Sequence, residues 1–300
     1  MTLWGKVDNP YMILPNLSML KVKHHALLLA MVCFWAGCVD FYTLTVPDHV
    51  AATGAEAPVI VRLQQNDLFF VRMPSPNQPI RFRIDGGIER NAHTDKAGYA
   101  ATLLPMPEKR GFYLMEVNLS DLEGDEVMRY ARSYIWDSDE PVLAVDADCL
   151  PLSANAEAVE ALNRMITRGI NIIYLTRKGV DDHFALHGKL EMAGYPDGPV
   201  LAWKREFYRI ERVSRFRAKV VVDTRLVSQV PQLRTMFPNM KAGVCDSTLS
   251  AEAFADADME VLMIGTDKAP SGVDVRRVTW YDLTDPNVYI PGIPGQPDRP

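Results

Sequence analysis

The chain has 300 residues, of which 48% are hydrophobic and 23% charged, and its formal net charge at pH 7 is −6. A chain of this length can bury a substantial hydrophobic core and commonly divides into two domains. The mild acidity and the lack of a long Lys/Arg run argue against a nucleic-acid-binding protein, because such proteins present a basic face to phosphates. We therefore expect a globular protein with no nucleic-acid partner.

The first distinctive segment is 19-MLKVKHHALLLAMVCFWAGC-38, in which a basic stretch precedes a short apolar run and small residues precede Cys38. This layout is typical of an export signal and is too short for a comfortable membrane span; a buried helix of the folded domain is the alternative. The last residues resemble a bacterial lipoprotein signal. That resemblance implies that residues 1–38 are an extension plus signal peptide, and that lipid on Cys38 anchors an exported protein to a membrane of the bacterial cell envelope.

Residues 39–57 show little periodicity and include the cluster AATGAEAP, so we predict a linker. Over residues 58–137, apolar and polar residues alternate in runs rich in β-branched and aromatic types, separated by Pro, Asn and Gly. This pattern predicts a small all-β sandwich. The turn 94-TDKAGYA-100 resembles bacterial immunoglobulin-like modules. The resemblance implies either an adhesion and presentation role or a spacer.

Over residues 138–283 the pattern changes to continuous apolar strands that alternate with helices. The strands are PVLAVDAD, INIIYLT, PVLAW, MKAGVCDS and EVLMIGT, and the first helix has Ser153 as its N-cap and Gly169 as its C-cap. Fully apolar strands alternating with helices predict a doubly wound parallel α/β sheet covered on both faces. The Pro- and Gly-rich residues 284–300 predict a tail that wraps the surface or is disordered.

Polar residues follow three of these predicted strands. Asp146 and Asp148 follow the first strand, Thr176 ends the second, and Asp246 follows a later one. Because ligands in such sheets bind beyond the carboxyl ends of the strands, we expect these side chains to meet in one crevice. Clustered carboxylates repel one another unless a cation neutralises them, and oxygen ligands suit Mg²⁺. The sequence thus predicts a magnesium site.

The order and spacing of these motifs resemble the haloacid dehalogenase (HAD) superfamily of phosphohydrolases, and the layout is most similar to its lipin-like phosphatidate phosphatase branch. The resemblance implies that Asp146 is a nucleophile that forms an aspartyl-phosphate, and that Asp148 is the general acid and base. It implies that Thr176 binds the phosphoryl group. It also implies that Asp146, Asp246 and the backbone carbonyl of Asp148 hold the magnesium ion.

The resemblance also implies a lysine that binds the phosphoryl group, for which Lys219 is the candidate and Lys204 the alternative. The chain departs from the family pattern at two places: Leu150 stands where Thr or Val is usual, and Ser250 stands where a second acid is expected. Glu252 lies two residues beyond that position. The missing acid predicts a weaker metal site, or one completed by water and Glu252, and makes loss of turnover an alternative.

Two functions follow from these patterns. The first is a magnesium-dependent phosphate-ester hydrolase, acting on a phosphate ester or on a phospholipid such as phosphatidate near the membrane. The second is a non-catalytic surface lipoprotein that keeps the fold and has a binding or structural role. Only residues 195–218 leave room for a substrate-selecting cap, and a small cap would leave an open site.

Two further pairs of residues have alternative interpretations. His183 and His187 lie four residues apart on a predicted helix and could ligate a metal, although without a third ligand they are more often surface or rim residues. Cys149 and Cys245 adjoin the acids at neighbouring strand ends. They are either a disulfide formed in an oxidising compartment or two small buried thiols.

Overall fold

A computed structural model describes residues 41–67, 71–85, 87–119, 127–153, 156–214, 217–265, 267–285 and residue 290. The predicted signal and the lipidation site Cys38 lie outside these residues. The chain divides into two units, one made of residues 1–41 and 66–72 and the other of residues 42–65 and 73–300. Almost all of the elements below lie in the second unit; the first residue of β1, the last two of β3 and the first two of β4 belong to the first unit. No helix among the described residues combines the length and the apolar character needed to span a membrane.

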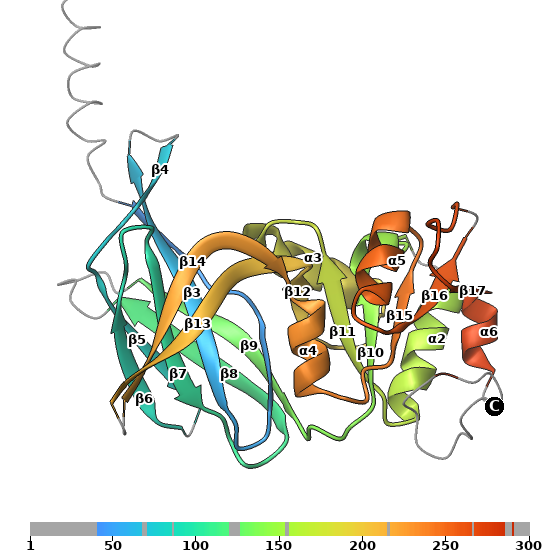
Figure 1. The fold of residues 1–300 in the computed structure, drawn as a ribbon, viewed down its shortest axis with the longest axis horizontal. Coiled ribbons are helices and arrows are strands. Elements are labelled where there is room, and N and C mark those ends of the chain that lie inside the picture. The colour runs from blue at the N-terminus through green and yellow to red at the C-terminus, as the bar shows by residue number, and fades with distance from the viewer. Residues whose placement is uncertain are drawn as a thin grey trace, which may run out of the picture. The chain divides into compact units, whose positions relative to one another are not determined.

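Two β-sheets occupy the chain up to Trp136. Their strands are β1 (Phe41–Thr45), β2 (His49–Ala52), β3 (Glu56–Asp67), β4 (Val71–Pro74), β5 (Pro79–Ile84), β6 (Glu89–His93), β7 (Tyr99–Pro105), β8 (Gly111–Leu119) and β9 (Met128–Trp136). One sheet has the order β1-β3-β4 with β7 beside β3, and the other has the order β2-β9-β8-β5-β6 (Figure 1). Alternating apolar side chains of both sheets fill one core, which makes this part a sandwich.

The stretch 39–57 contains strands where the sequence analysis placed a linker. β2 pairs in parallel with β9, with Val50 opposite Tyr134. Val50 and Ala51 are buried. Only four residues form this strand, which is too short for the alternation of apolar and polar residues to stand out in the sequence.

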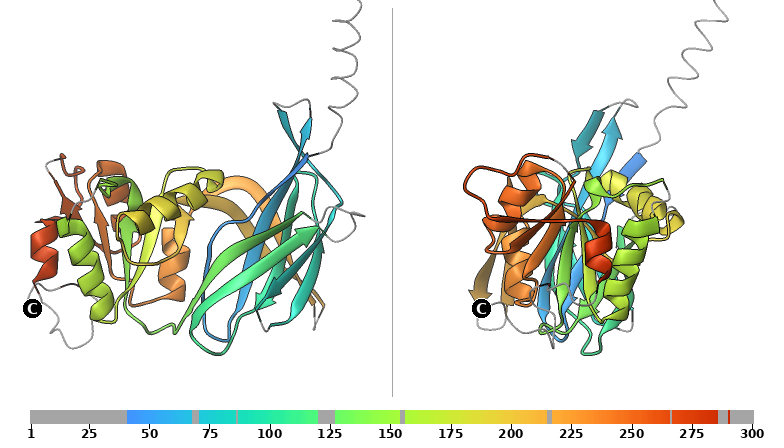
Figure 2. Two further views of the ribbon diagram at one scale, coloured as in Figure 1. Left: turned by 180° about the vertical axis from the view of Figure 1, so that it is seen from behind. Right: turned by 90° about the vertical axis from the view of Figure 1, so that its right-hand side faces the viewer.

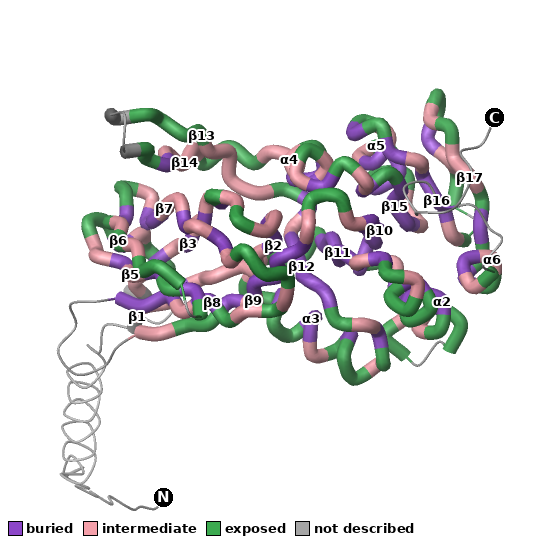
Figure 3. The backbone as a smooth tube through the Cα atoms, turned by 90° about the horizontal axis from the view of Figure 1, so that it is seen from below, coloured by how far each residue is buried: buried purple, intermediate pink, exposed green. Residues whose placement is uncertain are grey.

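The region from Val142 onward contains a six-stranded parallel sheet with the order β12-β11-β10-β15-β16-β17. Its strands are β10 (Val142–Asp146), β11 (Asn171–Thr176), β12 (Val200–Ala202), β15 (Ala242–Cys245), β16 (Glu260–Ile264) and β17 (Val275–Val278). The helices are α2 (Ala156–Thr167), α3 (Val180–Met192), α4 (Val230–Met236), α5 (Thr248–Ala255) and α6 (Trp280–Thr284). Helices α2, α3 and α6 pack on one face of the sheet and α4 and α5 on the other (Figure 2). Strands β10 and β15 are therefore buried along their whole length (Figure 3).

A long antiparallel hairpin, β13 (Lys204–Ser214) and β14 (Arg217–Ser228), follows β12. It occupies much of the stretch 195–218 that was considered as a cap. The Tyr99 hydroxyl of β7 donates a 2.8 Å hydrogen bond to Glu206 of β13, so the base of the hairpin lies against the sandwich. The hairpin therefore joins the sandwich instead of covering the ends of the parallel strands.

The predicted fold class, an α/β domain of the HAD type preceded by a small sandwich, is wrong for this chain. The structure is mainly β, with 47% strand and 21% helix. The largest difference is the hairpin β13–β14, whose sequence carries charged residues at many positions, such as Arg205, Arg209 and Glu211. These charges mask the strand periodicity, because β-strand signals depend on a half-buried surface.

His49 of β2 should make folding sensitive to mild acid. Burial lowers its pKa to about 4, assisted by the charge of Arg205, and its Nδ1 is buried without a partner among the described atoms. Because this pKa lies below the unfolded value near 6.5, the unfolded state binds more protons between these values, and stability falls as the pH drops through that window. We expect His49 to account for a loss of about 1 to 2 kcal/mol between pH 7 and pH 5.

Urea unfolding at pH 7 and pH 5 measures this loss. A His49→Gln variant, which cannot gain the proton, should lose less stability over the same interval than the wild type does. An equal loss in both proteins would exclude His49 as the source.

Candidate functional site at the ends of the parallel strands

The structure brings Asp146, Asp148 and Thr176 together at the carboxyl ends of β10 and β11. Asp146 ends β10 and lies opposite Leu175 of β11. Asp146 and Thr176 are both fully buried. Asp148 lies in the short 3₁₀ turn Ala147–Cys149. The hydroxyl of Thr176 donates to Asp148 Oδ1 at 2.7 Å, and the Arg177 backbone N–H donates to Asp148 Oδ2 at 2.8 Å. Asp148 is therefore held by the end of the neighbouring strand.

Asp246 follows β15, which pairs with β10 on the side away from β11. Burial raises the pKa of Asp246, and the negative charge of Asp146 raises it further. The two carboxylates are thus close enough to repel each other.

The side chain of Arg177 lies among these acids. Its Nη1 is 3.3 Å from Asp146 Oδ2 and 3.5 Å from Asp148 Oδ2. Its Nη2 donates to Ser247 Oγ at 3.1 Å and also to the hydroxyl of Ser250. The guanidinium stacks over the Trp203 ring, with 5.5 Å from its central carbon to the ring centroid. Arg177 therefore neutralises the acidic end of β10 from within the chain.

Both carboxylate oxygens of Asp146 have partners. Oδ1 accepts from the Asp148 backbone N–H at 3.1 Å, and Oδ2 accepts from the hydroxyl of Ser250 and from Arg177. Ser250 is itself fully buried in α5, beside Ser247 at the N-cap of that helix. A carboxylate that is fully buried and bonded at both oxygens is a poorly available nucleophile, because attack would require it to give up these bonds.

These residues do not fit a magnesium ion. Mg²⁺ takes oxygen ligands in octahedral geometry, and a guanidinium directly beside the carboxylates would repel it. Ser250 stands where a second acid would supply charge. Within the residues that the structure describes, no group of three or more His, Cys, Asp or Glu side chains is placed to hold a metal. We derive no chemical step through a metal here.

The predicted phosphoryl-binding lysines do not join the site. Lys219 lies on β14, opposite Glu211 in the hairpin, and is exposed. Lys204 begins β13 and is also exposed. The hairpin carries Lys219 along the sandwich side of the molecule, so that neither lysine has a described contact with Asp146.

Cys149 and Cys245 are both free thiols. The Cys149 thiol donates to the backbone oxygen of Asp146 at 2.9 Å. Burial and the charge of Asp146 raise the pKa of Cys149 well above its usual range, and they raise the pKa of Cys245 to about 12. Both groups thus stay protonated at neutral pH and are unreactive, which favours the interpretation as buried thiols.

The two histidines of α3 are buried, so the expectation of surface or rim residues is wrong. His183 is 4% and His187 7% exposed. Burial lowers the pKa of His183, which therefore stays neutral. His187 contacts Arg132 of β9 and Asp197 of the segment after α3. These contacts could not be predicted from local sequence, because the partners lie 55 residues before and 10 residues after the histidine.

Arg177 was not predicted as a member of the site. The available signal was a pair of changes: an arginine directly after Thr176, and Ser250 in place of an acid. One change adds a positive charge and the other removes a negative one. Together they indicate a site that is neutralised by the protein itself.

No protein-family model matches the chain, and no curated protein matches it. Among solved structures, the chain is similar to the D0-D1 domain of intimin, with 18% identity, a TM-score of 0.25, and coverage of 32% of this chain and 49% of that one. It is also similar to a carbohydrate acetylesterase from Xanthomonas citri, with 13% identity, a TM-score of 0.33, and coverage of 82% and 64%. The bacterial integrin-binding protein invasin has 16% identity, a TM-score of 0.26, and coverage of 36% and 23%.

The chain spans less than two thirds of each of these three structures. The resemblance to the HAD superfamily and its lipin-like branch is wrong for this chain, because the structure is mainly β, with 47% strand and 21% helix. The comparisons hold no evidence for a HAD phosphatase or for magnesium.

Proposed function

We propose that the chain is an exported, membrane-anchored protein of the bacterial cell envelope with a non-catalytic binding or structural role. The observation that carries this proposal is the environment of Asp146. Its side chain is fully buried, and both of its carboxylate oxygens accept hydrogen bonds from groups of the same chain. An active site for group transfer needs a free nucleophile and charge reserved for the transition state. At this strand end, Arg177 and Ser250 already donate hydrogen bonds to the carboxylate of Asp146.

The network instead has the properties of a structural centre. Arg177 connects the ends of β10 and β11 with the start of α5 through one guanidinium. Charge-assisted hydrogen bonds of this kind hold elements in a fixed register. The centre therefore stabilises the carboxyl ends of these inner strands. A binding role would then use another part of the molecule.

The export part of the proposal rests on residues 19–38, where a basic stretch, a short apolar run and Cys38 follow one another. Lipid attached to Cys38 would supply the membrane anchor. A lipid anchor keeps a binding protein at the envelope surface without a membrane-spanning helix.

A phosphatase assay tests the non-catalytic role. We expect no turnover of a generic aryl phosphate or of phosphatidate above the level of an Asp146→Asn variant, with or without Mg²⁺, because Asp146 cannot attack while Arg177 and Ser250 hold it. Magnesium-dependent hydrolysis through Asp146 stays a prediction of the sequence. Turnover that requires Mg²⁺ and disappears in Asp146→Asn would establish that function and contradict ours.

A further inference from the structure

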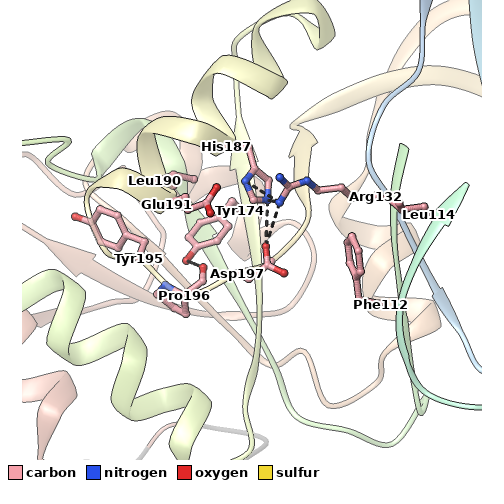
Figure 4. A pocket seen from close by; sticks show the side chains of 11 residues that line it. Phe112, Leu114, Arg132, Tyr174, His187, Leu190, Glu191, Tyr195, Pro196 and Asp197 are labelled. Carbon is pink, nitrogen blue, oxygen red and sulfur yellow. Dashed lines mark hydrogen bonds and ion pairs between the residues drawn. The ribbon is translucent and has the colours of Figure 1, made fainter. Parts of the chain in front are cut away.

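A cavity of about 370 Å³ lies beside the carboxyl-terminal half of α3. Its walls come from β8 and β9 of the sandwich, from α3, from Tyr174 of β11, and from the segment 195–198 that precedes β12 (Figure 4). A volume of this order is within the range of small-molecule sites. The cavity shares no residue with the Asp146 network, so it can bind a ligand whatever that network does.

A fixed polar group forms one wall. Tyr134 donates to Asp197 Oδ1 at 2.8 Å, and His187 Nε2 lies 3.2 Å from the same oxygen. Arg132 Nη1 lies 3.0 Å from His187 Nδ1 and 3.4 Å from Asp197 Oδ1 (Figure 4). Arg132 Nη1 also lies 2.7 Å from His187 Nε2, so the guanidinium contacts both ring nitrogens. Arg132, His187 and Asp197 thus form one contiguous row of polar side chains.

Two groups of this wall, Asp197 and Tyr134, have shifted pKa values. Hydrogen bonds from His187 and Tyr134 lower the pKa of Asp197, so the carboxylate stays ionised. Burial and the charge of Asp197 raise the pKa of Tyr134, so its hydroxyl keeps the proton that it donates. The side chain of Asp197 is nevertheless 57% exposed, and that of Arg132 is 32% exposed. Each can therefore still reach a ligand in the cavity.

The opposite wall is apolar and open. Phe112 is 50% and Leu114 46% exposed, although both are large hydrophobic residues of β8. The Phe112 ring is held edge-on to Tyr134, with 5.4 Å between centroids. Figure 4 shows Phe112 on the far side of the cavity from His187. A ligand between these walls would contact an aromatic face on one side and paired charges on the other.

We propose that this cavity binds a neutral polyhydroxylated ligand of the saccharide class. A carboxylate and a guanidinium side by side match neighbouring hydroxyl groups, each of which both donates and accepts a hydrogen bond. The C–H face of a sugar ring packs on an aromatic ring such as Phe112. A ligand of either charge is disfavoured, because an anion meets Asp197 and Glu191 while a cation meets Arg132.

Saturation-transfer NMR with maltose, cellobiose and N,N′-diacetylchitobiose tests the proposal, with choline and methyl phosphate as charged probes. We expect at least one sugar, and neither charged probe, to receive saturation. The dissociation constant should rise about tenfold or more in Phe112→Ala and in Asp197→Asn. Tyr281→Ala, which removes a 73% exposed ring on α6, is the matched control and should bind as the wild type does.

Three outcomes would overturn the saccharide site: no transfer to any sugar, transfer unchanged in both cavity variants, or transfer to choline or methyl phosphate alone. Circular dichroism shows whether each variant is folded. If Asp197→Asn does not fold, Phe112→Ala still tests the site, because it truncates a half-exposed ring. Asp146→Asn should bind the sugar normally. The sugar result is therefore independent of the phosphatase assay, and either proposal can fail without the other.

Discussion

Replacing Arg177 with Met should lower the free energy of unfolding by about 3 kcal/mol, because it leaves the buried carboxylate of Asp146 without its cation. The side chain of Asp146 is fully buried, whereas that of Arg177 is 37% exposed, so the cost arises mainly at the carboxylate. Met keeps an unbranched apolar side chain at this position and removes only the charge and the hydrogen-bond donors of the guanidinium. Urea unfolding at neutral pH measures the effect.

Arg209→Met is the matched control. Arg209 pairs with Glu211 on β13, where the two side chains are 65% and 45% exposed, so its loss should cost no more than about 1 kcal/mol. The double variant Arg177→Met/Asp146→Asn removes both charges and should recover part of the lost stability. Equal costs for Arg177→Met and Arg209→Met would contradict the internal neutralisation of Asp146.

Phe254→Ala should destabilise the protein by about 3 to 5 kcal/mol, since it opens a cavity in the core. Phe254 of α5 is fully buried, and its ring centroid is 5.0 Å from that of Trp203. It fills the space left by Gly243 of β15, where an added Cβ would come within 2.5 Å of the ring. The Phe254 ring therefore holds α5, and with it Ser250, against the sheet.

Leu249→Ala on the same helix is the control, because Leu249 is 63% exposed and should change stability by about 0.5 kcal/mol or less. Thermal or urea unfolding of both variants gives the comparison. If Phe254→Ala lowers the free energy of unfolding by less than about 1 kcal/mol, this ring does not hold α5 against the sheet.

Several elements were predictable because local signals agreed with their surroundings. The apolar run before Asp146 predicted β10, which ends at that residue, and the prediction is confirmed. Gly169 was predicted to follow the first helix, and it adopts the positive φ of 80° that favours glycine there. Thr176 ends β11, as expected from a second continuous apolar run.

The contacts between these elements were not predictable in the same way. Ser250 and Arg177 meet Asp146 across 104 and 31 residues of sequence, and only the packing of α5 on β15 brings Ser250 there. A pattern of acids alone does not show whether a metal or an arginine neutralises them. The cavity beside His187 depends likewise on β9, α3 and the segment 195–198 coming together.

Arg177 occupies the place of a cation at the end of β10. Titration calorimetry with Mg²⁺, on the wild type and on Asp146→Asn, tests this most directly. We predict no saturable binding heat at neutral pH in either protein, because the guanidinium and the hydroxyl of Ser250 already satisfy Asp146. Saturable one-site binding of Mg²⁺ by the wild type that is lost in Asp146→Asn would contradict the claim.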